Sequence, residues 1–227
     1  MNPLLSLSAT RLAEMIRKRE ITSRQVVETH IERIRRVNPK LNALVRDRFD
    51  QARAEADDAD RRTGQTDLPP FHGVPITIKE SFELEGMPQT SGLVSRKNVV
   101  SRKDATTVAR VRAAGAIPLG VTNVPELCLW IECSNRVYGR TLNAYDSRRI
   151  AGGSSGGEGA IIGAGGSPFG IGSDIGGSIR LPAFFNGIFG HKPTGGLVPN
   201  TGQWPVATGE AGLYHTTGPL TRRAEDL

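Results

Sequence analysis

Two serines and one lysine stand in patterns that could carry out acyl-transfer chemistry. Ser154 and Ser178 each lie in a glycine-rich run, where the backbone can adopt tight conformations and approach other groups closely. Lys79 ends a segment in which apolar residues alternate with others, as in a strand. A serine becomes a nucleophile when a base takes its proton, and lysine can be that base when burial lowers its pKa. The three residues predict a serine hydrolase with a lysine base.

The second glycine-rich run also offers hydrogen-bond donors for a developing negative charge. The backbone N–H groups of residues 175–178 belong to Ile175, Gly176, Gly177 and Ser178. Successive N–H groups in a glycine turn at the start of a helix converge on one point, and the helix dipole favours an anion there. An oxyanion beside Ser178 would need donors of this kind.

Nucleotide-binding interpretations of the glycines fail on their spacing. A P-loop ends in Gly-Lys-Ser/Thr, and the run 152–157 has no lysine at that place. A dinucleotide fingerprint would require glycine at position 175, which is Ile175. Close helix packing explains Gly163, Gly165 and Gly166 well but explains the Gly-Gly-Ser pairs poorly.

Histidine and cysteine offer no rival chemistry by pattern. None of the four histidines stands in a recognisable triad sequence, so each is interpreted as structural; they are His30, His72, His191 and His215. The two cysteines, Cys128 and Cys133, are too few for a zinc ribbon and are interpreted as core or pocket-lining thiols. No metal site is predicted.

The composition is that of an ordinary globular protein with many glycines. The 227 residues are 37% hydrophobic and 23% charged, with 27 glycines and a formal net charge of +6. Basic groups at 17–19 and 33–36 are interpreted as solvated helix faces, with a charged macromolecular substrate as the alternative. The sequence contains no signal-peptide pattern and no apolar run long enough for a membrane span, which predicts a cytoplasmic protein.

The amino-terminal residues are expected to be helical. Leu12, Met15 and Ile16 recur at helical spacing, as do Val27, Ile31 and Ile34. Ser8 is expected to cap the first helix, and Thr22 with Gln25 forms a capping-box pattern for the second, which should end near Asn38-Pro39. The charged, Ala-rich residues 48–62 predict a third, exposed helix.

Beyond residues 68–70 the pattern becomes that of an α/β protein. Strands are expected at 74–79 and 117–121, and helices at 106–114, at 125–132 and from Ser178 onward. This predicts an N-terminal helical region, residues 1–66, packing on an α/β core, residues 67–227. Residues 222–227 resemble the opening of a helix that is not continued, so they should fray unless a continuation covers them.

Three separated elements in one order resemble the amidase signature family. They are the lysine strand with its following glutamate, residues 74–80, and the two serine runs within 152–193. The resemblance extends from the first helices to the carboxyl end. Residues 126–135, 138–140, 182–187, 190–193 and 198–200 are similar to the branch that contains fatty-acid amide hydrolase 2.

The resemblance implies a fold, a reaction and roles for individual residues. The fold is a mixed β-sheet covered by helices on both faces, and the reaction is hydrolysis of a small-molecule amide without a cofactor. Lys79 would be the base, Ser154 the central serine after a cis peptide bond, and Ser178 the acylated nucleophile. Ile175, Gly176 and Gly177 would form the oxyanion hole. The supporting residues would be Ser155, Asp174 and Arg180, with Trp130 and Cys133 either near the acyl pocket or in the core.

The sequence departs from the family in its length. Full members continue well beyond this point, so the chain is expected to be truncated at the carboxyl end and to lack part of the substrate pocket. A homodimer is possible under the resemblance, and no direct nucleic-acid contact is implied. One alternative is the glutaminase subunit of an aminoacyl-tRNA amidotransferase, whose partner acts on tRNA. Another is an inactive scaffold that binds a partner through an exposed sheet edge.

Overall fold

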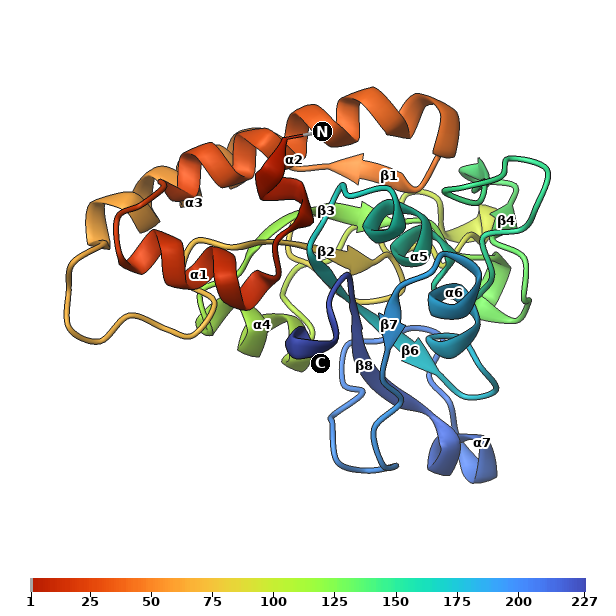
Figure 1. Ribbon diagram of the computed structural model, residues 1–227. Helices are drawn as coiled ribbons and strands as arrows, with labels where there is room; N and C mark the ends of the chain where they lie inside the picture. Colours follow the sequence, from red (N-terminus) through yellow and green to blue (C-terminus); the bar gives the residue numbers. More distant parts are fainter. Residues whose placement is uncertain (1) are drawn as a thin grey trace.

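The computed structural model describes residues 2–227 and is organised around a six-stranded sheet (Figure 1). The strand order is β1-β3-β2-β6-β8-β7. Strand β2 lies parallel to β3 and to β6, whereas the other neighbouring pairs are antiparallel, so the sheet is mixed as expected. A separate ribbon joins β4 to β5. The strands are β1 (Leu44–Asp47), β2 (Pro75–Lys79), β3 (Ile117–Thr122), β4 (Ser134–Asn135), β5 (Gly139–Arg140), β6 (Phe169–Asp174), β7 (Phe189–Gly190) and β8 (Thr216–Thr221).

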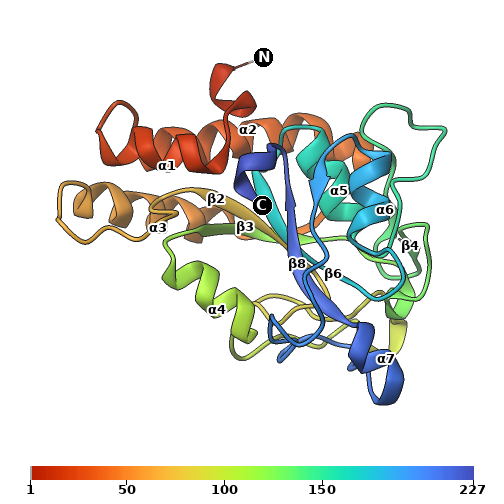
Figure 2. The same cartoon turned by 60° about the horizontal axis from the view of Figure 1, so that its bottom comes forward.

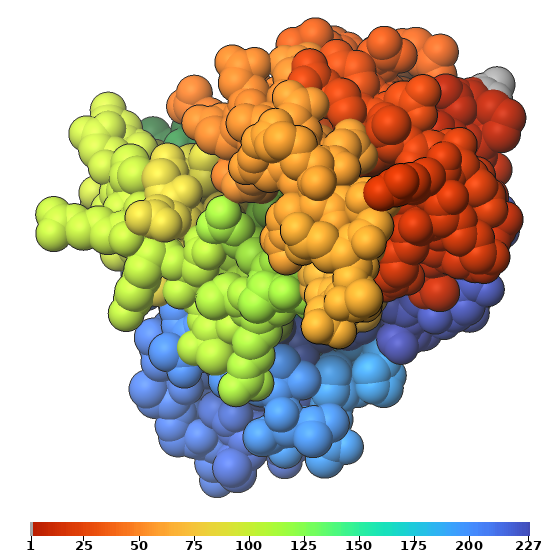
Figure 3. Space-filling view, turned by 90° about the vertical axis from the view of Figure 1, so that its left-hand side faces the viewer, coloured from red at the N-terminus to blue at the C-terminus, as the bar shows by residue number. Residues whose placement is uncertain are grey.

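Helices lie on both faces of this sheet, which confirms the predicted fold class. Figures 1 and 2 show α2, α3 and α5 on one side and α4 on the other. In Figure 3 the red and orange N-terminal helices meet the yellow-green residues around α4, with the blue C-terminal residues below. The helices are α1 (Ala9–Arg17), α2 (Ser23–Leu41), α3 (Phe49–Arg62), α4 (Thr106–Ala113), α5 (Gly156–Gly163), α6 (Arg180–Phe185) and α7 (Gly209–Tyr214). Short 3₁₀ turns occur at Pro3–Ser6, Val94–Arg96, Glu126–Cys128 and Ala224–Asp226.

The sheet separates two apolar clusters. One packs α2, α3 and α5 around Leu119 and Ile161, and the other packs α1 and α4 around Ile76 and Ile78. Side chains alternate between the faces of a strand, so Ile76 and Ile78 point into the second cluster while Thr77 points toward α5. Lys79 lies in the same alternating set as Thr77. The apolar core therefore fixes the strand that carries the lysine.

The caps of the first two helices are as expected, but the second helix ends later. Ser8 Oγ accepts the N–H of Arg11 at 3.0 Å, and the capping box between Thr22 and Gln25 is formed. Helix α2 continues through Pro39 to Leu41, which is buried. The side chain of Asn38 holds this last turn, because its Oδ1 accepts the N–H groups of residues 43 and 44. The expected end at Asn38-Pro39 is therefore wrong.

Two other predicted helices differ from the structure. Residues 125–132 form only the turn Glu126–Cys128, because Leu127 and Cys128 adopt left-handed backbone with φ of 56° and 58°. The N–H of Leu127 donates to the carbonyl of Ser91 rather than to a helical partner. Helix α3 is present but is not simply exposed, since Phe49 and three alanines on one face are buried.

The two ends of the described chain contact each other. Asp226 is nearly buried, and its carboxylate accepts the N–H groups of Ala9 at 2.8 Å and Thr10 at 2.9 Å at the start of α1. Figure 2 shows the C-terminal turn beside α1. Residues 222–227 are thus tied down rather than frayed. The division at residue 66 stays a prediction, although β1 places part of the first region in the sheet.

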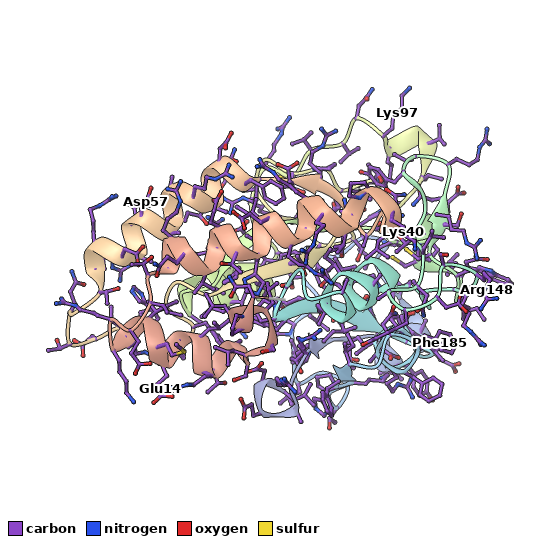
Figure 4. The ribbon with its side chains drawn as sticks, turned by 45° about the horizontal axis from the view of Figure 1, so that its top comes forward. Glu14, Lys40, Asp57, Lys97, Arg148 and Phe185 are labelled. Carbon is purple, nitrogen blue, oxygen red and sulfur yellow. The ribbon has the colours of Figure 1, made fainter. Side chains whose placement is uncertain are left out.

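The charged residues of the N-terminal helices lie mainly on their outer faces. Figure 4 shows Glu14 on α1, Lys40 on α2 and Asp57 on α3 pointing away from the sheet. Glu14 pairs with Arg11 and Lys18, and Asp57 pairs with Arg24. Of the basic groups at 17–19 and 33–36, Lys18, Arg19, Arg35 and Arg36 are exposed, as the interpretation of solvated faces expects. Arg17 and Arg33 are instead half-buried and donate to the backbone carbonyls of Pro69 and Ala164. Within residues 2–227, no helix combines the length and the apolar character needed to cross a bilayer.

Candidate active site

Lys79 and Ser154 are in direct contact in the interior. Lys79 is the last residue of β2, and Ser154 lies just before α5, after a cis peptide bond from Gly153. Lys79 Nζ donates to Ser154 Oγ at 2.7 Å and to Ser173 Oγ at 3.0 Å. The lysine side chain is fully buried, and this burial lowers its pKa from the usual 10.5. Among residues 2–227 no carboxylate is in salt-bridge contact with Lys79, so no ion pair stabilises its protonated form.

A buried glutamate joins the strand of Lys79 to the helix that follows Ser154. Glu158 on α5 accepts hydrogen bonds from Thr77 Oγ1 at 2.6 Å and from Thr122 Oγ1 at 2.8 Å. Burial raises the pKa of Glu158 to about 8, so the carboxyl group is mostly protonated at neutral pH. The helix can approach this closely because a Cβ at Gly170 would collide with Glu158. When it is protonated, Glu158 lacks the negative charge that would raise the pKa of Lys79.

Ser178 lies in the same cavity as the other two serines. It lies in the turn between β6 and α6 and lines a cavity of about 350 Å³ together with Ser154 and Ser173. A larger hollow of about 810 Å³ lies beside α2 and β1, but none of the three predicted catalytic residues lines it. The other residues around the smaller cavity are Leu127, Cys128, Leu129, Ile175, Gln203, Pro205, Val206, Ala207, Thr208, Ala211 and His215.

Asp174 shapes the turn that precedes Ser178. Its carboxylate accepts the N–H groups of Gly177 at 2.8 Å and Ile179 at 3.0 Å, and it pairs with the Arg180 guanidinium at 2.9 Å. Although burial acts against ionisation, Arg180 and these N–H groups lower the pKa of Asp174 to about 2. The predicted supporting pair Asp174 and Arg180 thus fixes the backbone on which Ser178 stands.

The backbone donors around Ser178 are not all equivalent. Within residues 2–227, the N–H groups of Ile175, Gly176 and Ser178 have no protein acceptor, whereas that of Gly177 is bound to Asp174. Three donors therefore remain for an oxyanion, and Ser178 itself supplies one of them. Of the three residues predicted to form the oxyanion hole, Ile175 and Gly176 have a free N–H group and Gly177 does not.

Ser155 connects the two glycine-rich runs. Its N–H donates to the carbonyl of Ser178 at 3.1 Å, and its hydroxyl lies 3.4 Å from the backbone of Ser173. Trp130 is largely exposed and Cys133 is buried, and neither lines the cavity. Cys128 does line it, in agreement with a pocket-lining thiol.

Four polar residues at the site were not singled out from the sequence. Glu158 could have been noticed in the sequence, because it lies four positions after Ser154 and is the one charged residue of an otherwise apolar helix. Ser173 precedes Asp174 and accepts hydrogen bonds from Lys79 and from Gln203. Gln203 and His215 come from a distant part of the chain and carry no local motif. Only the fold brings these two residues to the cavity.

Comparisons with known proteins find relatives over nearly the whole chain. The sequence profile of the amidase family, described as "Amidase", matches residues 25–227. Fatty-acid amide hydrolase 2-A of Danio rerio is 56% identical over all of this chain and 44% of its own length. Fatty-acid amide hydrolase 2 of Homo sapiens is 52% identical over 99% of the chain and 44% of its own length. A solved structure of fatty acid amide hydrolase superposes with a TM-score of 0.94 at 31% identity, covering 100% of this chain and 41% of that one.

The chain belongs to the amidase family, as the match over most of its residues shows. The sequence resemblance to the fatty-acid amide hydrolase 2 branch is likewise confirmed. The chain spans about 44% of the length of the curated relatives that it matches. The rest of the length of those relatives has no counterpart in these residues.

Proposed function

We propose that the protein containing this chain hydrolyses a carboxylic amide to an acid and an amine or ammonia through an acyl-enzyme. The observation that supports this best is the buried contact of 2.7 Å between Lys79 Nζ and Ser154 Oγ, beside a cavity that Ser178 also lines. A lysine without a salt bridge is a suitable base once burial has lowered its pKa. This pairing supplies the base that neither glycine-rich run contains.

The proposed first step moves two protons and forms one bond. A neutral amine has two N–H bonds and a lone pair. In this form Lys79 can still donate to Ser173, while the hydrogen bond with Ser154 reverses its direction and the lone pair takes the proton of Ser154. Ser154 Oγ takes the proton of Ser178 as Ser178 Oγ attacks the amide carbonyl. The free N–H groups of the turn at 175–178 would hold the resulting oxyanion.

The proposed second step releases the amine and then the acid. Ser154 returns a proton to the leaving nitrogen, because an amide anion is a very poor leaving group, and the C–N bond breaks. Ser154 regains its proton from protonated Lys79. Water, activated by the same pair, then cleaves the acyl-enzyme to the acid and frees Ser178.

The substrate is proposed to be an acyl amide rather than glutamine. The two relatives above 50% identity are fatty-acid amide hydrolases by name. Apolar residues also contribute much of the cavity wall, among them Leu129, Val206 and Ala211. The glutaminase subunit remains the alternative within the family. The scaffold alternative is weaker, because it leaves the buried lysine without a role.

The test is a turnover assay of the complete natural protein on acetamide, an aryl amide, a fatty amide and glutamine. We expect hydrolysis of the fatty or aryl amide and its loss in Ser178→Ala. Turnover of glutamine alone would favour the amidotransferase alternative. No turnover of any amide, or unchanged turnover in Ser178→Ala, would contradict the proposal.

A further inference from the structure

One titratable side chain in the cavity has no part in the reaction described above. His215 lies directly before β8 and lines the same cavity as Ser154 and Ser178. The residue is only 5% exposed. The other buried histidines differ from it. His30 bonds the carbonyl of Val26, and His72 bonds that of Ala59.

The backbone fixes His215 beside the oxyanion turn. The N–H of His215 donates to the carbonyl of Ala211, and its own carbonyl accepts from Asn200 Nδ2 at 2.8 Å. Thr216 pairs with Asp174 in the antiparallel ladder, so His215 flanks the turn that begins at Ile175. In a bound amide substrate, the carbonyl carbon would lie within reach of Ser178 and the carbonyl oxygen at that turn. This position would bring the scissile amide near the imidazole.

The ring offers hydrogen-bonding groups that the protein does not use. Within residues 2–227 neither ring nitrogen has a hydrogen-bond partner, and neither is sealed from solvent. Burial is the main cause that lowers the pKa of His215 to about 4. The imidazole is therefore neutral near pH 7, with one nitrogen as donor and the other as acceptor. Gln203 Oε1 also lacks a partner, but it is fully buried.

We propose that His215 is a specificity-determining residue whose imidazole accepts a hydrogen bond from the N–H of the scissile amide. This rests on the proposed amide hydrolysis and adds a reason for preferring amides over esters. A primary or secondary amide carries an N–H donor, whereas the ester of the same acid carries none. An acceptor at this place thus stabilises the amide and leaves the ester unaffected.

The test compares a primary amide with the methyl ester of the same acyl group, using the complete natural protein. His215→Leu keeps an apolar side chain of moderate size and removes the acceptor. We expect kcat/KM for the amide to fall about tenfold, which corresponds to about 1.4 kcal/mol, and kcat/KM for the ester to stay within twofold. His215→Asn, which retains an acceptor, should recover part of the loss. Tyr214→Phe, at the exposed neighbouring residue, should change neither rate.

The outcomes separate this inference from the proposed function. An equal fall for amide and ester would mean that His215 only shapes the cavity, and it would overturn the inference while leaving amide hydrolysis intact. Unchanged rates for both substrates would overturn it in the same way. Absence of amide turnover in the unaltered protein would overturn the proposed function and the inference with it.

Discussion

The candidate active site has a buried half and an open half. Lys79, Ser154, Ser173 and Glu158 are each at most 3% exposed. Hydrogen bonds join Lys79 to Ser154 and Ser173, and Glu158 on α5 accepts from Thr77 and Thr122 of the sheet. Among the other residues that line the cavity, Val206 is 69% exposed, and α7, which contributes Ala211 to the lining, carries Leu213 at 72% exposure. The comparison indicates that the core of this chain holds the proposed proton-transfer groups in position. The substrate-facing wall is only partly packed by the described residues.

The strongest expected effect comes from the buried half. Lys79→Ala removes the proposed base, so we expect amide turnover by the complete protein to fall about a thousandfold or more, on the order of 4 kcal/mol in the barrier. Steady-state kinetics on one amide would measure it. Lys40→Ala removes an exposed lysine from α2 and should leave the rate unchanged (Figure 4). A rate within tenfold of the unaltered protein would exclude Lys79 as the base.

The same substitution in the buried core and on exposed α7 should have unequal effects on stability. Leu119 on β3 is fully buried, and Leu119→Ala is expected to lower the free energy of unfolding by about 2–5 kcal/mol because it leaves a cavity. Leu213→Ala on exposed α7 should change it by about 0.5 kcal/mol or less. Urea unfolding followed by circular dichroism would compare them. Similar losses would mean that α7 is covered in the complete protein.

The smallest effect concerns Glu158 and depends on pH. Its pKa is raised by burial to about 8 in the folded state, against a usual value of 4.5. Between pH 4.5 and pH 8, Glu158 therefore keeps its proton in the folded state and loses it in the unfolded state. The contribution of Glu158 to the free energy of unfolding falls as the pH rises through this range. Glu158→Gln keeps a neutral group of the same shape and removes this dependence. We expect its stability relative to the unaltered protein to increase by about 1 kcal/mol or more from pH 5 to pH 8. A constant difference would show that Glu158 does not take up this proton.

The buried half was more predictable from the sequence than the open half. Lys79 ends an alternating strand, and Ser154 and Ser178 lie in glycine-rich runs, so local pattern was enough to select them as candidates that the fold brings to one site. The mixed sheet with helices on both faces followed from the family resemblance. The turn at Leu127 and Cys128 was missed because a contact with Ser91, distant in the sequence, overrides the helical pattern there.

Residues of the open half could not be recognised because their roles depend on tertiary contacts. His215 was interpreted as structural because it stands in no motif, and only the pairing of β8 with β6 places it beside the turn at Ile175. Gln203 reaches Ser173 at 2.9 Å from a loop with no signal of its own. Strand pairings of this kind join segments far apart in the chain, and residue spacing does not reveal them.

The proposal that Ser178 is the acylated nucleophile can be tested most directly by labelling. The complete protein would be treated with a fluorophosphonate, which forms a stable covalent adduct with an activated serine, and its peptides would be analysed by mass spectrometry. We expect one adduct on the peptide that contains Ser178, none in Ser178→Ala, and slower labelling at the same serine in Ser154→Ala. An adduct on Ser154, or equal labelling of Ser178→Ala, would contradict the assignment of Ser178 as the nucleophile.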